Sequence, residues 1–427
     1  MFSRRAGFLS EKEFEVDKMS NRTMTDEQVM RNRWDGLLKD MEKDSLDCLL
    51  THSTDRIYSS YLRYITDSPV SLYPMSGLFS KQGISLIGHG VPGVPLIPIP
   101  VEDQKSGAGR FHAGGVRLHP FVKDLIGVPA CPTTNYAPEI WAEAIGELIR
   151  KYGYRRIGIV GMNLVPVGIV EYLKRTINNL EFVDASSLVD ARKCVKSPYE
   201  IQQARDCASI IDEIMMAIPS VMKAGMTLRD VGKKLRSIAD GLDCMDLNIM
   251  LGKHPTMPMF SEWIYTDDEV ITKEDCVEIM VEVSSNVGFW GECARVFSLS
   301  EPSEELRKTV DFAFKAQTFA ADRLIPGSVS SQIYRDYCDE LVANGFPPEK
   351  RFFCHGQGYD VVEMPFIRPE NDAPIQSGSV VAIHPSLYDM NKKVGCFVCD
   401  NFLITEKGTV RLNKVPREII PVYNGTR

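Results

Sequence analysis

Residues 354–365 bring together side chains that can do acid–base and metal chemistry. The segment reads CHGQG at residues 354–358 and continues to EMP at residues 363–365. The imidazole of His355 can bind a transition metal, or move a proton near neutral pH. Glu363 adds a carboxylate nearby. We therefore take this segment as the first indication of an enzyme site.

The composition is that of a globular protein with an acidic balance. The chain has 427 residues, of which 44% are hydrophobic and 25% charged, and its net charge is −8. Such a balance offers no broad basic surface, so we expect no nucleic-acid partner. No apolar run approaches the ~20 residues that span a bilayer, so we expect no membrane partner.

Cysteine usage and the first residues indicate the compartment. The cysteines number 11, and only Cys396 and Cys399 form a close pair, at CxxC spacing. An odd number of scattered cysteines is typical of free thiols in a reducing compartment. Residues 1–9 become charged too early for a secretory signal. We therefore expect a cytoplasmic protein.

The elements that must position the site divide the chain into three parts. Residues 1–25 are polar and charged, which predicts an N-terminal arm. In residues 26–195 helix and strand patterns alternate, which predicts an α/β domain. We expect helices there at 24–43 and 137–152, and buried strands at 46–50, 83–87 and 156–160.

Residues 196–427 should form a second domain, whose first helix carries its own start signal. Ser197 fits an N-cap, Pro198 the first helical position and Glu200 the third place of a capping box. This helix should end near residue 222, and a second should follow residues 225–227. Strands are expected at 277–283, 294–299, 380–384 and 402–405, with a turn at 286–288.

These landmarks, in their order, resemble the creatinase / aminopeptidase P / methionine aminopeptidase superfamily. They are KSPYEI at 196–201, GFW at 288–290 leading to RVF at 295–297, HGQG at 355–358, IRP at 367–369, GSVVAIHP at 378–385 and DNFLITEKG at 400–408. The resemblance covers about residues 40–420. It implies a pita-bread α/β catalytic domain behind a smaller creatinase-type N-terminal α/β domain, and a homodimer.

The resemblance also implies where metal ligands would stand. Metallopeptidases of this family hold two metals with Asp, Asp, His, Glu and Glu. In that order, the positions are taken here by Val281 or Glu282, Glu292, His355, His384 and Cys399. The family motif runs HGxG…HExP, and the His of its HExP part is Val362 here; the family's proton-handling His falls on Met259, with His254 earlier in the same loop.

The changed ligand types decide what chemistry we expect. One carboxylate, two imidazoles and one thiolate suit a single Zn or Fe ion. Because a bridging carboxylate is lost, we expect one transition metal and neither aminopeptidase nor prolidase activity, with His254 or Glu282 moving protons. Metal-free catalysis stays open, with His355 and His384 as acid and base, and so does a catalytically dead binding protein.

Four other residues are candidates for substrate binding. Tyr359 and Trp290 would wall a small apolar pocket, although aromatic residues at such places are more often core. Arg368 would pair with a substrate carboxylate, or else neutralise Glu363. Tyr73 lies in a loop that the resemblance implies reaches the partner's active site, as a lid or only as an interface residue.

Together these positions predict a creatinase-like enzyme that cleaves a C–N bond of a small-molecule substrate. It would be a hydrolase, but not a standard metallopeptidase. Two alternatives remain at this point. One is a lyase acting on a small charged substrate, and the other is a non-catalytic binding protein on the same fold.

Overall fold

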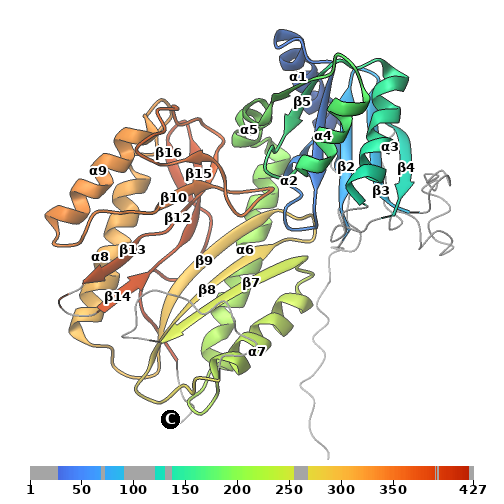
Figure 1. Cartoon of the computed structure of the whole chain (residues 1–427). Coiled ribbons are helices and arrows are strands. Elements are labelled where there is room, and N and C mark those ends of the chain that lie inside the picture. The colour runs from blue at the N-terminus through green and yellow to red at the C-terminus, as the bar shows by residue number, and fades with distance from the viewer. Residues whose placement is uncertain are drawn as a thin grey trace, which may run out of the picture.

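The computed structural model describes residues 27–68, 73–90, 121–129, 137–253, 268–389, 391 and 394–422 of the chain. The predicted arm at 1–25, together with His254 and Met259, lies outside the described residues. Figure 1 shows two groups of helices and strands, an N-terminal group coloured blue to green and a C-terminal group coloured green to red.

The N-terminal group is built on one mixed sheet. Its strands are β1 (Cys48–Ser53), β2 (Met75–Ser80), β3 (Gly83–His89), β4 (Val122–Val128), β5 (Arg156–Val160) and β6 (Glu181–Asp184). Its helices are α1 (Glu27–Lys43), α2 (Ser60–Thr66), α3 (Ala137–Tyr152), α4 (Val167–Thr176) and α5 (Ser186–Cys194). The strand order is β4-β3-β2-β1-β5-β6, with β1 antiparallel to β2 and parallel to β5.

Helices cover both faces of this sheet. Along β1, Leu49 joins the apolar cluster that contains residues of α1 and α5, whereas Cys48 and Leu50 join the cluster of α3 and α4. Every residue of β1 is buried, as expected for a strand enclosed on both sides. The helix predicted at residues 137–152 has those bounds in the structure.

The C-terminal group contains two larger sheets, one two-stranded sheet and four helices among the described residues. Its helices are α6 (Pro198–Val221), α7 (Leu228–Gly241), α8 (Glu304–Ala321) and α9 (Ser330–Ala343). Its strands are β7 (Asp246–Lys253), β8 (Cys276–Ser284), β9 (Trp290–Ser298), β10 (Cys354–Gly356), β11 (Glu363–Phe366), β12 (Val380–Ile383), β13 (Ser386–Asp389), β14 (Val394–Phe397), β15 (Asp400–Thr405), β16 (Gly408–Arg411) and β17 (Ile420–Pro421). The larger sheets run β17-β9-β8-β7 and β11-β10-β12-β15-β16, and β13 pairs with β14.

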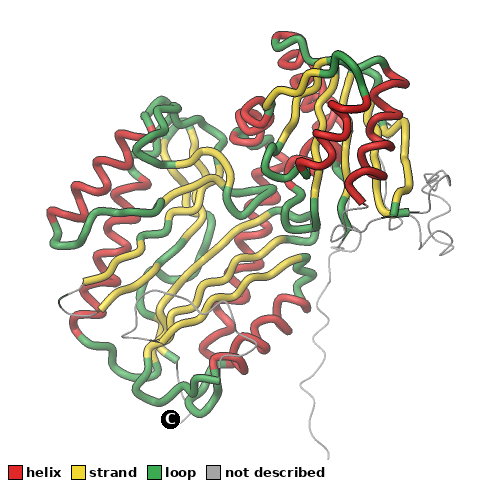
Figure 2. The backbone as a smooth tube through the Cα atoms, in the orientation of Figure 1, coloured by secondary structure: helices red, strands yellow, loops and turns green. Residues whose placement is uncertain are grey.

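The helices of this group lie on the outside and the strands lie between them (Figure 2). Apolar residues of α6 and α7 pack with β7–β9, and those of α8 and α9 pack with β10, β12 and β15. A smaller buried cluster lies on the inner sides of the sheets and contains Met250, Met280, Ala294, Ala382, Phe397 and Cys399. Ala294 and Cys399 form a β-bridge that joins the two sheets.

Local signals placed the start of α6 correctly. The Ser197 hydroxyl accepts a hydrogen bond from the Glu200 N–H at 3.3 Å, and the Ser197 N–H donates to the Glu200 carboxylate at 2.7 Å. This is the predicted capping box. The division of the chain at residues 195–196 falls between α5 and α6 and stays a prediction.

The start of β9 was predicted too late. The sequence indicates a strand from residue 294, but β9 begins at Trp290 and includes Glu292. Gly291 and Glu292 have low strand propensity, so the local sequence does not predict a strand at these residues. The pairing of β9 with β8 along its whole length decides the bounds instead.

Candidate metal centre

Three potential metal ligands converge from both sheets of the C-terminal group. Glu292 lies on β9, His355 on β10, and His384 directly after β12. One ligand atom from each of them lies within 4.8 Å of the others. His355 Nε2 is 3.7 Å from Glu292 Oε1, and the two imidazole centroids are 4.9 Å apart. All three side chains are buried.

Cys399 lies against the same cluster. It sits between β14 and β15, is fully buried, and its thiol donates to Glu292 Oε1 at 3.1 Å. The structure therefore brings Glu292, His355 and His384 together, and the predicted fourth donor, Cys399, contacts Glu292. Their donors are one carboxylate, two imidazoles and one thiol.

The register of β8 and β9 chooses between Val281 and Glu282. Glu282 is directly opposite Glu292, so the two share a face of the sheet. Val281 faces the other way, into the apolar cluster of α6 and α7. The Glu282 carboxylate accepts a hydrogen bond from the Asn248 amide at 2.8 Å. Glu282 is therefore the residue that stands on the side of the site.

His355 is oriented for metal binding. Its Nδ1 lies 2.9 Å from the Gly356 carbonyl oxygen, which assigns the proton to Nδ1. The lone pair then resides on Nε2, the nitrogen that faces Glu292. Burial lowers the pKa of His355 to about 4 and that of His384 well below its ordinary value. Both rings are therefore neutral at pH 7, as metal ligation requires.

Burial raises the pKa of the two acidic donors, Glu292 and Cys399, whereas it lowers that of the imidazoles. Burial, with a further contribution from the Glu282 carboxylate, raises the pKa of Glu292 to about 8. Burial and the neighbouring Glu292 raise the pKa of the Cys399 thiol well above its ordinary value. A bound cation would reverse both shifts, because it stabilises the carboxylate and the thiolate. The buried Glu292 Oε2, which has no hydrogen-bond partner among the described residues, is a further donor suited to a cation.

The predicted substrate-binding residues lie elsewhere. Tyr359 is buried in the core between the two groups, where its hydroxyl accepts a hydrogen bond from Arg33 at 2.8 Å. Trp290 is also buried, and its backbone N–H donates to the Gly358 carbonyl oxygen at 2.6 Å. Tyr73 is exposed on the N-terminal group and stacks on His89. For Tyr359 and Trp290, burial agrees with the core alternative.

Arg368 does not neutralise Glu363. It is exposed and pairs with Glu370 at 3.3 Å. The buried Glu363 carboxylate is instead held by Lys193, at 3.2 Å, and by Lys196. The predicted pairing of Arg368 with Glu363 was wrong, because two lysines near the start of α6 neutralise Glu363 instead. They lie far from Glu363 in the sequence, so no local pattern indicates the contact.

Two residues just before His355 were missed. The Phe352 ring makes edge contacts with both imidazoles, with centroid separations of 5.5 Å to His355 and 5.7 Å to His384. The Arg351 guanidinium lies over the same ring, 5.4 Å from its centroid, and its side chain is exposed. Its charge contributes to the lowered pKa of both imidazoles and opposes the rise at Glu292. Nearness to His355 was the only available signal in the sequence.

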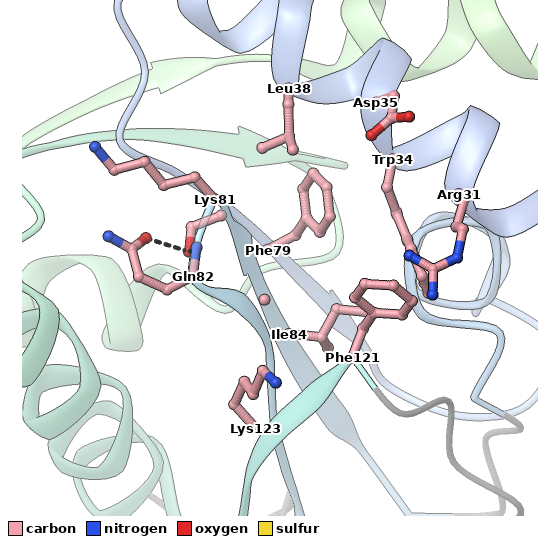
Figure 3. A pocket seen from close by; sticks show the side chains of 12 residues that line it. Arg31, Trp34, Asp35, Leu38, Phe79, Lys81, Gln82, Ile84, Phe121 and Lys123 are labelled. Atoms are coloured by element: carbon pink, nitrogen blue, oxygen red, sulfur yellow. Dashed lines mark hydrogen bonds between the residues drawn. The ribbon is translucent and has the colours of Figure 1, made fainter.

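A separate pocket of about 300 Å³ lies on the N-terminal group (Figure 3). It is lined by α1 and the β2–β3 turn, together with Phe121. Its Arg31 already pairs with Glu27 at 2.5 Å and lies over the Phe121 ring. None of the four clustered donors lines this pocket, so we do not place the chemistry there.

Comparison with known proteins identifies the class. Residues 202–406 match the profile of metallopeptidase family M24. The uncharacterized peptidase YqhT of Bacillus subtilis is 23% identical over 286 residues, which are 65% of this chain and 78% of that protein. The Xaa-Pro dipeptidase of Pyrococcus horikoshii is 24% identical over 273 residues, 63% of this chain and 76% of that protein.

Solved structures agree on the fold. The prolidase from Pyrococcus horikoshii superposes with a TM-score of 0.71 at 19% identity, covering 91% of this chain and 100% of that one. The likeness to metallopeptidase family M24 extends over residues 202–406, just under half of the chain. The predicted architecture, an N-terminal α/β domain followed by a pita-bread catalytic domain, is confirmed.

These comparisons correct the predicted function. The named relatives are peptidases, so the prediction of a creatinase-like enzyme that is not a metallopeptidase is wrong, as are its lyase and binding-protein alternatives. The broader prediction of a hydrolase acting on a C–N bond agrees with the family. The error came from equating altered ligand types with loss of peptidase chemistry. Within the described residues, no helix has the length and apolar character needed to cross a membrane.

Proposed function

We propose that the protein is a metal-dependent peptidase that hydrolyses the amide bond of short peptides. The observation that carries this proposal is the buried cluster of Glu292, His355 and His384 within an M24 domain. Relatives named as Xaa-Pro dipeptidase and dipeptidase support a dipeptide substrate. The three residues, with Cys399 as a fourth donor, would hold one Zn or Fe ion.

A bound metal of this kind supplies Lewis-acid activation of the scissile carbonyl group and of water. The chain's own residues have separate tasks. His355 is fixed by its Nδ1–H bond to Gly356, so its Nε2 keeps a constant direction. Glu282, opposite Glu292 and hydrogen-bonded to Asn248, is placed to take up a proton from water. Burial of the cluster keeps bulk water out and strengthens each electrostatic interaction.

Arg351 gives the site a preference for an anionic substrate. It is exposed, and it makes no ion pair with a carboxylate within the described part of the chain. Its guanidinium lies over the Phe352 ring, and that ring makes edge contacts with both imidazoles. A dipeptide bound with its amide bond at the cluster carries a free carboxylate close to that bond. We therefore propose that Arg351 binds this carboxylate by charge-assisted hydrogen bonds.

The test compares dipeptides with their C-terminal amides. We expect the metal-loaded protein to hydrolyse Xaa-Pro dipeptides, and Arg351→Ala to raise KM for the free acids about tenfold, the value of one hydrogen bond to a charged group. KM for the amides should not change. Steady-state kinetics with both substrate series provides the measurement.

Arg368→Ala is the matched control. Arg368 lies over Phe366, whose ring contacts Phe352, but its charge is already paired with Glu370. This variant should behave as the parent protein does. Equal KM values for acid and amide in all three proteins would contradict the role of Arg351. Failure to cleave any dipeptide after loading with Zn²⁺, Fe²⁺, Mn²⁺ or Co²⁺ would contradict the proposed function itself.

A further inference from the structure

Arg63 of the N-terminal group reaches into the C-terminal group and binds two of its loops. It lies on α2 and is buried. Its Nη1 donates to the Gly288 carbonyl oxygen at 2.5 Å, and its Nη2 donates to the Tyr359 carbonyl oxygen. Its Nε donates to the Ser59 hydroxyl at 3.0 Å, which fixes the guanidinium from its own side.

The two loops end the strands that carry metal-ligand candidates. Residues 285–289 connect β8 to β9, and residues 357–362 connect β10 to β11. The Trp290 N–H donates to the Gly358 carbonyl oxygen at 2.6 Å, so the loops are also joined to each other. Glu292 lies on β9 shortly after the first loop, and His355 lies on β10 shortly before the second loop.

The first loop is shaped around the guanidinium. Gly288 has a φ of +78°, in the region that favours glycine. A Cβ atom at this position would clash with Arg63 Nη1. Because Gly288 has no side chain, its backbone can lie directly against the Arg63 guanidinium. The Gly288 carbonyl oxygen accepts the hydrogen bond there.

We infer that Arg63 is a positioning residue through which the N-terminal domain sets the separation of Glu292 and His355. This inference rests on the proposed metal centre. Loops without regular hydrogen bonding are the softest part of such a sheet edge. A guanidinium with several donors in a fixed fork can hold two backbone carbonyl groups at one spacing, which a lysine ammonium does less well. Groups that orient metal ligands typically change metal affinity about 10–100-fold when removed.

The test measures Co²⁺ binding to Arg63→Lys and Arg63→Ala in the full chain. We expect about tenfold weaker binding for the lysine variant and a larger loss for the alanine variant. The visible spectrum of bound Co²⁺ should also change, because the ligand geometry changes. Arg56→Ala is the control, since Arg56 pairs with Asp246 of β7 at 2.5 Å across the same two groups but contacts neither loop.

Hydrogen exchange provides a readout that does not need metal. Both Arg63 variants should exchange faster at residues 285–292 and 355–362, whereas Arg56→Ala should not. Parent-like Co²⁺ affinity, spectrum and exchange in the Arg63 variants would overturn the inference. If the parent protein takes up no Co²⁺, the proposed metal centre fails, and the exchange rates alone then decide the role of Arg63. The lysine variant keeps the buried charge, so it also answers the question if the alanine variant does not fold.

Discussion

Replacing His355 with alanine should remove the bound metal and lower kcat/KM for dipeptides about 10³-fold. The loss corresponds to the several kcal/mol of transition-state stabilisation that a metal supplies as a Lewis acid. His355 is the ligand candidate whose Nε2 faces Glu292 at 3.7 Å and whose other nitrogen is fixed by a backbone carbonyl. Without it, the proposed site keeps three of its four donors, Glu292, His384 and Cys399. Metal analysis of the purified variant and dipeptide kinetics provide the measurement.

His52→Ala is the matched control for this change. His52 is also a buried imidazole, but it lies on β1 of the N-terminal group, hydrogen-bonded to Ser76 at 2.8 Å. Its removal should cost stability and leave metal content and kcat unchanged. A His355→Ala protein that kept a full equivalent of metal and the parent kcat would contradict the site assignment.

Replacing Arg295 with methionine should destabilise the C-terminal group by about 3–5 kcal/mol. Arg295 and Asp400 form an ion pair at 2.6 Å with both side chains fully buried. The guanidinium also donates to the carbonyl oxygens of Ala294, at 2.7 Å, and Cys399, at 2.8 Å. Its loss leaves a buried carboxylate without its main cation and frees the bridge that joins the two sheets. Urea unfolding measures the change in the free energy of unfolding.

Two further variants separate the causes. Arg411 also contacts Asp400, at 3.2 Å, but is partly exposed, so Arg411→Ala should cost about 1 kcal/mol or less. The double variant Arg295→Met with Asp400→Leu removes both charges and should regain most of the lost stability. An Arg295→Met protein within about 1 kcal/mol of the parent would show that the pair contributes far less than a buried ion pair should.

Features set by neighbouring residues could be predicted from the sequence. The Ser197–Glu200 capping box is such a feature, because both partners lie within one helical turn. The bounds of α3 are another. The start of β9 could not be found in this way, because its first residues form a strand only through pairing with β8.

The site was predicted in part, and for a different reason. Family resemblance pointed to Glu292, His355 and His384, which the structure brings together, and to Cys399, which contacts Glu292. Local sequence could not reveal the hydrogen bonds that Tyr359 accepts, at its hydroxyl from Arg33 and at its carbonyl oxygen from Arg63. Both donors lie in the other domain, far from Tyr359 in the sequence. The homodimer and the role of Tyr73 at its interface stay predictions.

In the proposed site, one metal ion is held by a carboxylate, two imidazoles and a thiolate. X-ray absorption spectroscopy of the metal-loaded protein measures this ligand set directly. For Zn²⁺ we expect nitrogen and oxygen neighbours at about 2.0–2.1 Å and one sulfur at about 2.3 Å, with no second metal nearby. The sulfur contribution should disappear in Cys399→Ser. A metal–metal distance of about 3.5–4 Å, or a ligand set of oxygen atoms alone, would contradict the account.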